Sequence, residues 1–567
     1  MKRYELVIVG GGPAGLAAAA AAASGGVQNI LLLERDQYLG GILNQCVHPG
    51  FGLQYFREEL TGPEYAARFI AELSKYPQIE VSLKSFAVRV TARREITYLK
   101  PGCCETVRAK ALVMATGCRE RTREMIHLPG DRPAGIFSAG LAQKLINSEG
   151  LLPGKEAYEK KVGWTKSRFN WNQVCSGGLT VGALAIADEE PQLAAFILNK
   201  TATGVQTAMS EFQPDGGTRE GPGYWSYAVQ FNVMMIAALQ SALGTDFGLS
   251  RFSGFDQTGR FRIHFVTPLK TVFSFGDGNS TTNANPAMFW LATQFDQPNY
   301  AGQDRTLFTS NKPFHLWWFV EEEHSQLCNE PTSAYFQHAG LAFMRSSWDS
   351  DAVYVAVKGG STATGHSHME LGHFQLIADE RLWLSDLGGV PYTKDYFHKE
   401  KRWTFYRATN LAHNVPVIDG KLQNLNASAP ITKFEIINDR TSVEIDLSDA
   451  YKGQVESASR CIILEKRIVT IEDIFSGVKG EQFLWQVHAP VRRAVVNETN
   501  PRQVDMQHFL KRMRMELLEP QNATFVIEEI NIPENQPPVK GITRIAVHLK
   551  IDSLPIHIKV RLTPITK

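Results

Sequence analysis

The spacing of hydrophobic and polar residues changes character twice along this chain of 567 residues. Residues 1–150 alternate short β-branched stretches with alanine-rich stretches, which indicates β-α-β units and a parallel sheet. Residues 157–310 are rich in residues that favour helices. Residues 311–567 contain long stretches that alternate apolar and polar positions, as antiparallel strands with one buried face do. The pattern therefore predicts three domains, an α/β domain, a helical domain and a large β-sandwich.

Individual elements follow from the same pattern. In the α/β domain it predicts strands at 6–9, 30–34 and 109–115 and helices at 13–23 and 63–74. In the helical domain it predicts two helices that are separated near Pro191. In the last domain it predicts long strands in AVYVAVKGG, FQLIADERLWLSD and CIILEKRIVTIEDIF, among others.

Charge and composition exclude some classes of partner. The 59 basic and 58 acidic residues nearly cancel, so no general attraction to nucleic acid or to acidic membranes is expected. The longest apolar run, 16–24, is too short to span a bilayer. The N-terminal MKRYELVIVGGG is typical of a strand that runs into a glycine turn rather than of a signal peptide, which favours a cytoplasmic location.

The cysteines indicate neither a disulfide framework nor a cysteine-rich metal site. There are seven of them, scattered along the chain. No two stand in a CxxC pair, which argues against a four-cysteine zinc site.

A glycine motif near the N-terminus predicts a nucleotide cradle. VIVGGGPAGL places Gly10, Gly12 and Gly15 in a G-x-G-x-x-G pattern between a predicted strand and a predicted helix. The glycines permit a tight turn and let a pyrophosphate approach the N-terminus of the helix. Glu34 ends the next predicted strand, where its carboxylate can accept hydrogen bonds from a ribose.

Three stretches of this first region resemble the flavin-dependent pyridine nucleotide-disulfide oxidoreductases. They are YELVIVGGGPAGLAAA, LLLERDQYLGGILNQC and ALVMATGCRERTR. The resemblance implies that the first motif holds FAD and that Ala115, Thr116 and Gly117 lie near the flavin. It ends near 149–156, before the second glycine motif for NAD(P)H and before the strand that completes the FAD site in that family. We therefore expect a partial Rossmann-like domain with an incomplete FAD site.

Cys46 lies within the second of these stretches. It has no second cysteine close by in the sequence, as a redox-active disulfide would require. A redox role and an ordinary buried thiol are both open for Cys46.

From about Tyr158 onward, the sequence resembles the heparinase II/III-like polysaccharide lyases. The resemblance is carried by FNWNQVCSGGLTVGALAI, PDGGTREGPGYWSYA and GHSHMELGHFQL, the last followed by WLSDLGG and RATNLAHNVPVIDG. It implies an α/α toroid, truncated at its N-terminal side, followed by an antiparallel β-sandwich. It also implies cleavage of a uronic-acid polysaccharide by β-elimination, which leaves an unsaturated uronosyl end.

Such a reaction needs three kinds of group. The uronate carboxylate must be neutralised, the weakly acidic proton on C5 removed, and the leaving glycosidic oxygen protonated. An amide or an imidazole can serve the first need. A tyrosine, with its ordinary pKa of about 10, or a histidine can serve the other two.

The lyase-like stretches supply one candidate for each role. Asn170 fits the neutralising amide, with Asn172 as the alternative and a turn or helix-cap asparagine as the structural interpretation. Tyr224 fits the base or the acid, with Tyr227 as the competitor and aromatic packing as the structural interpretation. His366 fits the second proton-transfer residue.

Larger side chains near these candidates could line a sugar cleft. Trp171, Trp225 and Arg345 are the examples. Core packing is the alternative for each of them.

The resemblance also implies a structural zinc ion. The matching positions are His368, Asp386 and His413, and two imidazole nitrogens with one carboxylate oxygen suit Zn²⁺. The segment 370–373 departs from the family pattern, so His373 is a candidate for an additional ligand.

His366 and His368 form an H-x-H pair. If the pair lies on a strand, both rings point to one face and lie about 6.5–7 Å apart along it. We expect His366 to face the sugar while His368 binds the zinc.

The sequence thus supports a polysaccharide lyase acting on an acidic polysaccharide. An FAD-dependent NAD(P)H oxidoreductase and a non-catalytic carbohydrate-binding chimera are the alternatives. No nucleic-acid or membrane partner is expected. The uronate, endo- or exo-cleavage, the oligomeric state and the origin of the join near 151–158 stay open.

Overall fold

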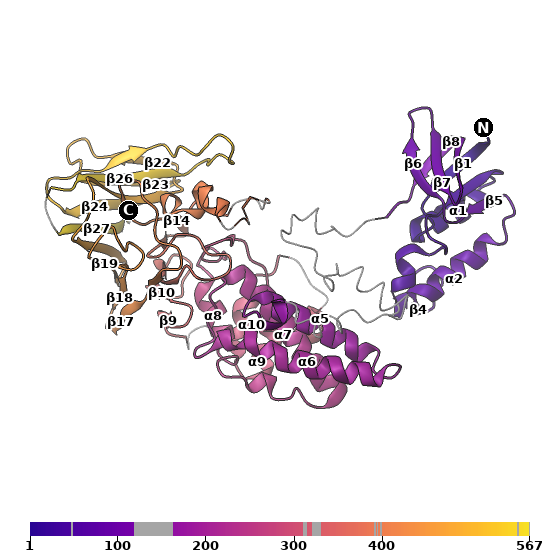
Figure 1. Ribbon diagram of the computed structural model, residues 1–567, viewed down its shortest axis with the longest axis horizontal. Helices are drawn as coiled ribbons and strands as arrows, with labels where there is room; N and C mark the ends of the chain where they lie inside the picture. Colours follow the sequence, from indigo (N-terminus) through magenta and orange to yellow (C-terminus); the bar gives the residue numbers. More distant parts are fainter. Residues whose placement is uncertain are drawn as a thin grey trace. The chain divides into compact units, whose positions relative to one another are not determined.

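The computed structural model describes most of the chain as two compact units. These units are Met1–Ala157 and Tyr158–Lys567, and each is treated by itself (Figure 1). The described residues are 1–46, 49–117, 163–309, 314–319, 330–389, 393, 395–396, 398, 400–552 and 555–565. The expected join near 151–158 and the end of the third flavoenzyme-like stretch lie outside these residues.

The first unit is built around a six-stranded sheet with the order β5-β2-β1-β8-β7-β6. Its neighbours β5, β2, β1 and β8 are parallel, whereas β7 and β6 add an antiparallel meander. The elements are β1 (Arg3–Val9), α1 (Pro13–Ser24), β2 (Ile30–Leu33), β3 (Pro49–Phe51), β4 (Leu60–Thr61), α2 (Gly62–Leu73), β5 (Ile79–Ser82), β6 (Phe86–Val90), β7 (Glu95–Lys100) and β8 (Cys103–Met114).

The predicted elements of this unit are confirmed, although β1 and β8 begin earlier than expected. Helix α2 begins where Thr61 and Glu64 form a reciprocal capping box. Strand β8 begins at Cys103 because its first half pairs with β7, and only its second half was recognisable as an apolar parallel strand.

The second unit begins with helices. They are α5 (Asn170–Ala185), α6 (Pro191–Met209), α7 (Pro222–Leu243), α8 (Thr258–Phe265), α9 (Pro286–Gln294), α10 (Pro298–Arg305) and α11 (His315–Trp318). Helix α5 packs against both α6 and α7. A Cβ on Gly177 of α5 would lie 2.7 Å from the carbonyl oxygen of Phe231 of α7, so glycine allows the two helices to approach closely. Among the helices of the described residues, none is long and apolar enough to cross a membrane.

The rest of the second unit is rich in antiparallel strands. The main sheets have the orders β14-β13-β11-β10-β9, β15-β21-β26-β25 and β17-β18-β19-β20-β27-β24-β23-β22. The strands are β9 (Ala334–Phe336), β10 (Leu341–Arg345), β11 (Tyr354–Lys358), β12 (Gly360–Ser361), β13 (Phe374–Ala378), β14 (Arg381–Leu384), β15 (Val417–Ile418), β16 (Ser428–Ala429), β17 (Ile431–Ile437), β18 (Arg440–Asp446), β19 (Ser457–Glu465), β20 (Ile468–Ser476), β21 (Gln482–Ala489), β22 (Arg493–Val496), β23 (Gln503–His508), β24 (Lys511–Glu519), β25 (Val526–Glu528), β26 (Thr543–Lys550) and β27 (Ile556–Ile565).

One hydrophobic core joins the three main sheets. It contains the fully buried Trp383 of the five-stranded sheet, Trp485 of the four-stranded sheet and Ile471 of the eight-stranded sheet. The Trp485 indole donates to Asp473 at 2.8 Å, so its polar edge is satisfied inside the core. An α/β first region, a helical middle and a β-rich C-terminal region are therefore confirmed.

Two details differ from what the sequence suggested. The H-x-H pair lies in a loop between β12 and β13, not on a strand. The expected strand FQLIADERLWLSD is a hairpin of β13 and β14, because Asp379 and Glu380 turn with positive φ angles of 52° and 60°. Alternating side chains alone did not reveal either turn.

Candidate active site and metal centre

The loop that carries the H-x-H pair is held against a second loop of the helical region. The backbone N–H of Asp277 donates to the carbonyl of His366 at 2.9 Å. A Cβ on Gly276 would lie 2.3 Å from the same oxygen, so only glycine permits this approach. His366 itself has a φ of 62°, a left-handed conformation that costs energy in a non-glycine residue. Backbone strain of this kind is found most often at active sites and ligand-binding positions.

Asn170 lies at the beginning of α5 and is 2% exposed. Its backbone N–H and its Nδ2 both donate to the carboxylate of Glu220, at 2.7 and 2.8 Å. Phe169, the residue before the helix, has no capping side chain, so Glu220 supplies the missing acceptor at this helix end. Burial raises the pKa of Glu220, although the hydrogen bonds from Asn170 act in the opposite direction.

Tyr224 lies in the first turn of α7 and stacks on His366. The ring centroids are 3.9 Å apart and the planes are inclined by 11°. The Nε2 atom of His366 lies 3.9 Å from Glu220 Oε1, which links this stacked pair to Asn170. The three predicted catalytic residues thus lie in one site. The competitor Tyr227 is 50% exposed and contacts Phe231 instead.

Asp277 was not singled out from the sequence, yet it contacts both histidines of the H-x-H pair. Its Oδ2 lies 3.0 Å from His366 Nδ1, and its Oδ1 lies 3.0 Å from His368 Nε2. Arg402 donates to Oδ1 at 2.7 Å, and Tyr396 donates to the same oxygen. Burial alone would raise the pKa of Asp277, but the hydrogen bonds from the two histidines outweigh it and hold the pKa well below its usual range. An aspartate in the loop FGDGN offers no sequence signal for this role.

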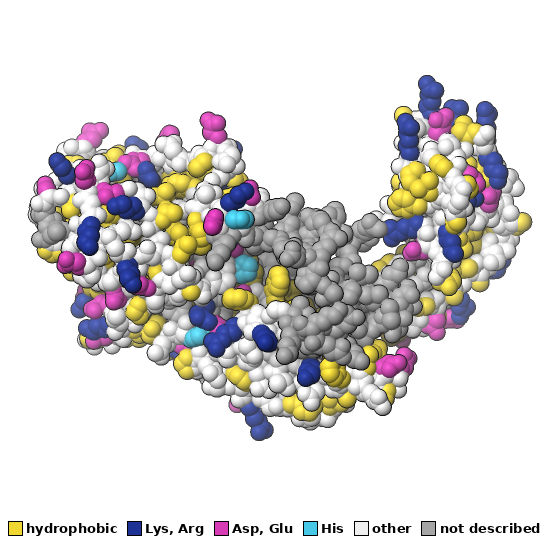
Figure 2. Space-filling model, in the orientation of Figure 1, with side chains coloured by type: hydrophobic (Ala, Val, Ile, Leu, Met, Phe, Trp, Pro, Cys, Tyr) yellow, Lys and Arg dark blue, Asp and Glu magenta, His cyan; other side chains and the backbone are white. Residues whose placement is uncertain are grey.

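A small charged pocket lies beside Tyr224. Its lining includes Arg168, Glu211, Arg219 and Glu220. Arg219 binds Glu211 through two hydrogen bonds of 2.8 and 2.6 Å, while Arg168 is largely exposed. Figure 2 shows basic and histidine side chains together on one face of the second unit.

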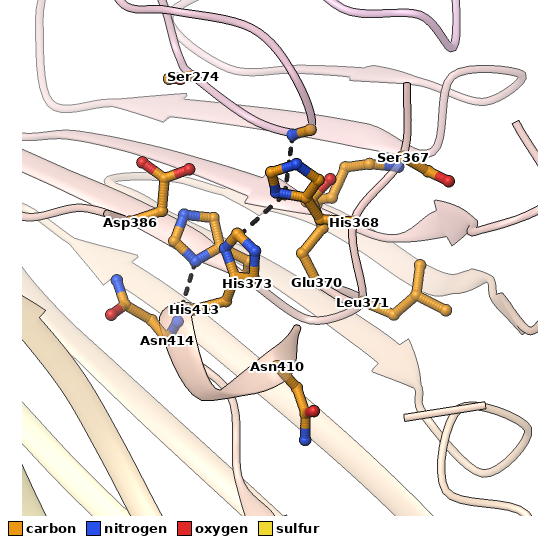
Figure 3. A network of polar contacts seen from close by, with 12 residues as sticks. Ser274, Ser367, His368, Glu370, Leu371, His373, Asp386, Asn410, His413 and Asn414 are labelled. Carbon is orange, nitrogen blue, oxygen red and sulfur yellow. Dashed lines mark hydrogen bonds and ion pairs between the residues drawn. The ribbon is translucent and has the colours of Figure 1, made fainter. Parts of the chain in front are cut away.

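Five buried side chains, among them His368 of the H-x-H pair, form a candidate metal centre. Within the described residues, donor atoms of His368, Glu370 and His413 lie within 4.8 Å of one another, and so do those of His373, Asp386 and His413. Figure 3 shows these side chains close together; three of them come from the loop before β13, and Asp386 and His413 come from two other segments. The three predicted ligands therefore do not form one group. His413 belongs to both groups, His368 shares the first with Glu370, and Asp386 shares the second with His373.

The donor set fits a divalent cation. Each of the five residues has at least one buried nitrogen or oxygen without a hydrogen-bond partner in the described part of the chain. Burial keeps the pKa values of His373 and His413 well below the usual value, so both imidazoles are neutral and able to bind metal. Burial and the neighbouring Glu370 raise the pKa of Asp386 to about 7, a repulsion that a cation would relieve. Imidazole and carboxylate donors suit Zn²⁺.

Two other residues that the sequence suggested for the site, Asn172 and Trp225, are buried and hydrogen-bonded inside the protein. Asn172 is fully buried and donates to the carbonyls of Ser167 and Gly204, both at 3.0 Å. The indole of Trp225 is 1% exposed and donates to Thr258 at 2.7 Å.

Arg345 is likewise not a cleft residue. It is 5% exposed, and its guanidinium donates to backbone carbonyls such as that of His264 at 3.1 Å. It lies between the rings of Trp348 and Tyr354. Trp171, 46% exposed, remains a candidate for sugar contact.

Replacing Asn172 should therefore affect stability rather than catalysis. The Asn172→Ala change leaves buried carbonyls without donors, which costs about 2–4 kcal/mol of the free energy of unfolding. Urea unfolding followed by fluorescence should show a lower midpoint, with kcat of the remaining folded protein within a few-fold of wild type. An unchanged midpoint together with lost activity would make Asn172 the better candidate for the neutralising amide.

In the first unit, the glycine motif has the conformation of a nucleotide cradle. Gly10 has a φ of 110°, and a Cβ on Gly15 would lie 1.8 Å from the Gly10 carbonyl oxygen. Among the described residues, and apart from its chain neighbours, a Cβ on Gly12 would have one atom within 4 Å, the Gly41 Cα at 3.9 Å, so the N-terminus of α1 is approachable in this part of the structure. These features fit the pyrophosphate of a dinucleotide.

The other predicted cofactor residues lie at the same edge of the sheet. The buried carboxylate of Glu34 accepts from the backbone N–H groups of Gly11 and Asp36, at 2.7 and 2.8 Å. The Ala115 N–H donates to Val9 at 2.8 Å, which places Ala115, Thr116 and Gly117 directly after β8.

Cys46 in this unit is a half-buried free thiol. No sulfur-to-sulfur bond links it to another cysteine of the described residues. Its redox role stays a prediction.

Comparisons with known proteins agree with the two-part resemblance. Residues 4–161 match the family model described as pyridine nucleotide-disulphide oxidoreductase. Residues 329–529 match the one described as heparinase II/III-like, C-terminal. Both predicted resemblances are thereby confirmed, each for its own part of the chain. No curated protein matches the sequence.

Solved heparinases share the fold of the larger part. The heparan sulfate lyase HepC from Pedobacter heparinus has 14% sequence identity and a TM-score of 0.58, covering 76% of this chain and 65% of its own. A structure titled heparinase III has 12% identity and a TM-score of 0.55, covering 69% of this chain and 61% of its own. The chain thus spans less than two thirds of the length of either structure. The shared fold is that of the heparinases.

Proposed function

We propose that the second unit is a polysaccharide lyase that cleaves a uronic-acid polysaccharide by β-elimination. The observation that carries this proposal is the convergence of Asn170, Tyr224 and His366 from three separate segments. An amide, a phenol and an imidazole are the groups that the reaction needs. The heparinase-like fold supports the same reaction class.

Each residue has a role in this proposal. Asn170 keeps one Nδ2 hydrogen on Glu220, which orients the amide so that its other N–H group can meet the uronate carboxylate. The hydroxyl of Tyr224 takes the C5 proton or protonates the leaving oxygen. His366, stacked against Tyr224, performs the other transfer.

The helices around the site favour an anionic substrate. Tyr224 lies in the first turn of α7, whose N-terminal end is positive, whereas Glu220 already accepts hydrogen bonds at the start of α5. The largely exposed guanidinium of Arg168, 3.9 Å from Glu211, adds a positive charge that a substrate carboxylate can share. Binding of an acidic polysaccharide should therefore weaken as salt concentration rises.

The candidate metal centre has a structural role in this proposal. His368, Glu370, His373, Asp386 and His413 would hold the ion, and all five are buried. Bound metal would join the H-x-H loop to β14 and to the loop before β15, and so would fix the floor of the cleft. We further propose that the helical and β-rich parts correspond to a truncated α/α toroid and a β-sandwich.

The direct test is incubation of purified protein with a panel of uronate polysaccharides. Elimination creates a carbon–carbon double bond conjugated to the carboxylate, which absorbs ultraviolet light. A growing ultraviolet signal with at least one polysaccharide is expected. Binding without any such signal across heparan-like, alginate-like and other uronates would favour the non-catalytic carbohydrate-binding alternative.

For the first unit we propose weak FAD binding without oxidoreductase activity. Its glycine cradle and its family match favour FAD binding, whereas no second glycine motif follows in the sequence. We expect substoichiometric flavin and no NADH oxidation, because the resemblance to the flavoenzymes ends before the strand that covers the isoalloxazine ring in that family. The visible absorbance spectrum and an NADH consumption assay measure both. One FAD per chain with NADH turnover would contradict this expectation and restore the oxidoreductase alternative.

A further inference from the structure

We propose that Asp277 is a positioning residue that fixes the ring tautomers of His366 and His368 together, directing one ring to the substrate and the other to the metal centre. The half that concerns His366 rests on the proposed lyase function. The half that concerns His368 rests only on the candidate metal centre.

The geometry gives each histidine its own carboxylate oxygen. Oδ2 of Asp277 is 3.0 Å from Nδ1 of His366, and Oδ1 is 3.0 Å from Nε2 of His368. An ionised carboxylate only accepts hydrogen bonds, and the Tyr396 hydroxyl, 2.9 Å from His368 Nε2, donates its own hydrogen to the same Oδ1. The nitrogen that faces Asp277 therefore carries a hydrogen in each ring. The two rings are therefore held in opposite tautomers, Nδ1–H for His366 and Nε2–H for His368.

For His366, this leaves Nε2 as the nitrogen available for proton transfer. Nε2 is the atom on the side of Glu220, 3.9 Å from its Oε1, and the ring lies against Tyr224. The His366 side chain is 22% exposed, so this nitrogen is not sealed in the core. In its neutral form His366 can thus accept a proton at the position where the proposed catalytic groups converge.

For His368, the same carboxylate leaves Nδ1 without a hydrogen. Nδ1 is buried and has no hydrogen-bond partner among the described residues. His368 shares a 4.8 Å cluster of donor atoms with Glu370 and His413. A lone pair on Nδ1 is what a metal ion requires from this ring, and a carboxylate on the other nitrogen is the usual support for such a ligand.

Asp277 is itself firmly held as an anion. Its side chain is 1% exposed, and Arg402 donates to Oδ1 at 2.7 Å. The same arginine nitrogen donates to the carbonyl of Ser367, between the two histidines, at 2.8 Å. The Asp277 N–H also holds the backbone of His366 at 2.9 Å. The aspartate therefore fixes both the backbone and the ring of His366, which explains how its left-handed conformation is maintained.

This arrangement accounts for the H-x-H pair without a strand. On a loop, nothing in the local backbone would direct two rings to different tasks. One shared carboxylate does so, because its two oxygens select different nitrogens on the two rings. A carboxylate-to-amide change that leaves a histidine in the wrong tautomer costs about 10⁴-fold in kcat in serine proteases.

The decisive variant is Asp277→Asn, which preserves shape but replaces one accepting oxygen with a donating amide. We expect kcat on the cleaved uronate polysaccharide to fall about 10²- to 10⁴-fold with KM changed only a few-fold. Zinc affinity, measured by competition with a chelator, should weaken about 10- to 100-fold. The matched control is Asp379→Asn, a buried carboxylate that binds Arg467 at 2.6 Å, which should retain both activity and zinc.

Nitrogen NMR of histidine-labelled wild-type protein tests the proposal independently of activity. The expected spectrum shows His366 protonated at Nδ1, and His368 protonated at Nε2, with His366→Ala and His368→Ala spectra used for assignment. An absence of lyase activity would refute the proposed function, while the NMR result would still decide the tautomers. Protonation of neutral His366 at Nε2, or an Asp277→Asn variant with wild-type kcat and zinc affinity, would overturn the role of Asp277.

Discussion

Tyr224→Phe should lose most of the lyase activity while leaving the fold intact. The change removes only the hydroxyl, so the ring can still stack on His366. If that hydroxyl transfers a proton in the transition state, its loss should lower kcat about 10²- to 10⁴-fold. KM should change little, because the ring and the surrounding charges remain. Initial rates of ultraviolet absorbance on the active polysaccharide measure both constants.

The matched control is Tyr227→Phe. Tyr227 lies in the same helix, α7, but its side chain is 50% exposed and packs edge-on against Phe231. This variant should retain nearly wild-type kcat. If Tyr227→Phe is inactive and Tyr224→Phe is active, the roles of the two tyrosines are exchanged.

His366→Ala should lower kcat as much as Tyr224→Phe does. A His366→Ala variant with wild-type turnover would remove His366 from the mechanism.

His413→Ala should have the largest effect on the metal centre. His413 is the residue shared by both groups of candidate ligands, and both of its ring nitrogens are buried without partners in the described residues. Wild-type protein should contain close to one zinc per chain by elemental analysis, and the variant almost none. At free zinc about 100 times Kd, bound metal adds about 2.7 kcal/mol to the free energy of unfolding. A chelator should therefore lower the Tm of wild type but not that of the variant.

His264→Ala separates metal loss from the loss of a buried ring. His264 is also fully buried, but it lies near Glu330 rather than in the candidate metal centre. This variant should lose stability and keep its zinc. Metal-free wild-type protein with an unchanged Tm after chelation would contradict the metal centre.

The sequence predicted those parts of the fold that depend on local patterns. The helix 13–23 and the separation of two helices near Pro191 follow from helix-forming composition and from proline at a helix start. The hairpin at Asp379 and Glu380 was missed, because its one common turn residue, Asp379, has no glycine, proline or asparagine beside it.

The sequence predicted only those residues of the candidate site that lie within recognisable motifs. Asn170, Tyr224 and His366 stand in recognisable stretches, and the structure brings them together. Asp277 and Glu220 act through contacts with residues far away in the sequence, so spacing could not reveal them.

The candidate metal ligands show the same limit. The resemblance named His368, Asp386 and His413, and the departure from the family pattern marked His373, whereas the structure adds Glu370 to the cluster. Glu370 lies in the same departing segment as His373. A sequence can mark such a departure, but only the folded loops show that the new side chains face the same point.

We propose that the second unit breaks uronate polysaccharides by elimination, and the masses of the reaction products distinguish elimination from any other cleavage. Elimination adds no water, so the masses of the two product chains must sum to the mass of the substrate. Mass spectrometry of a defined uronate oligosaccharide after incubation should show an unsaturated fragment and no product pair that is heavier than the substrate by one water. Products that carry one added water would mean hydrolysis, and an intact oligosaccharide across the whole uronate panel would mean no cleavage; either result would rule out elimination.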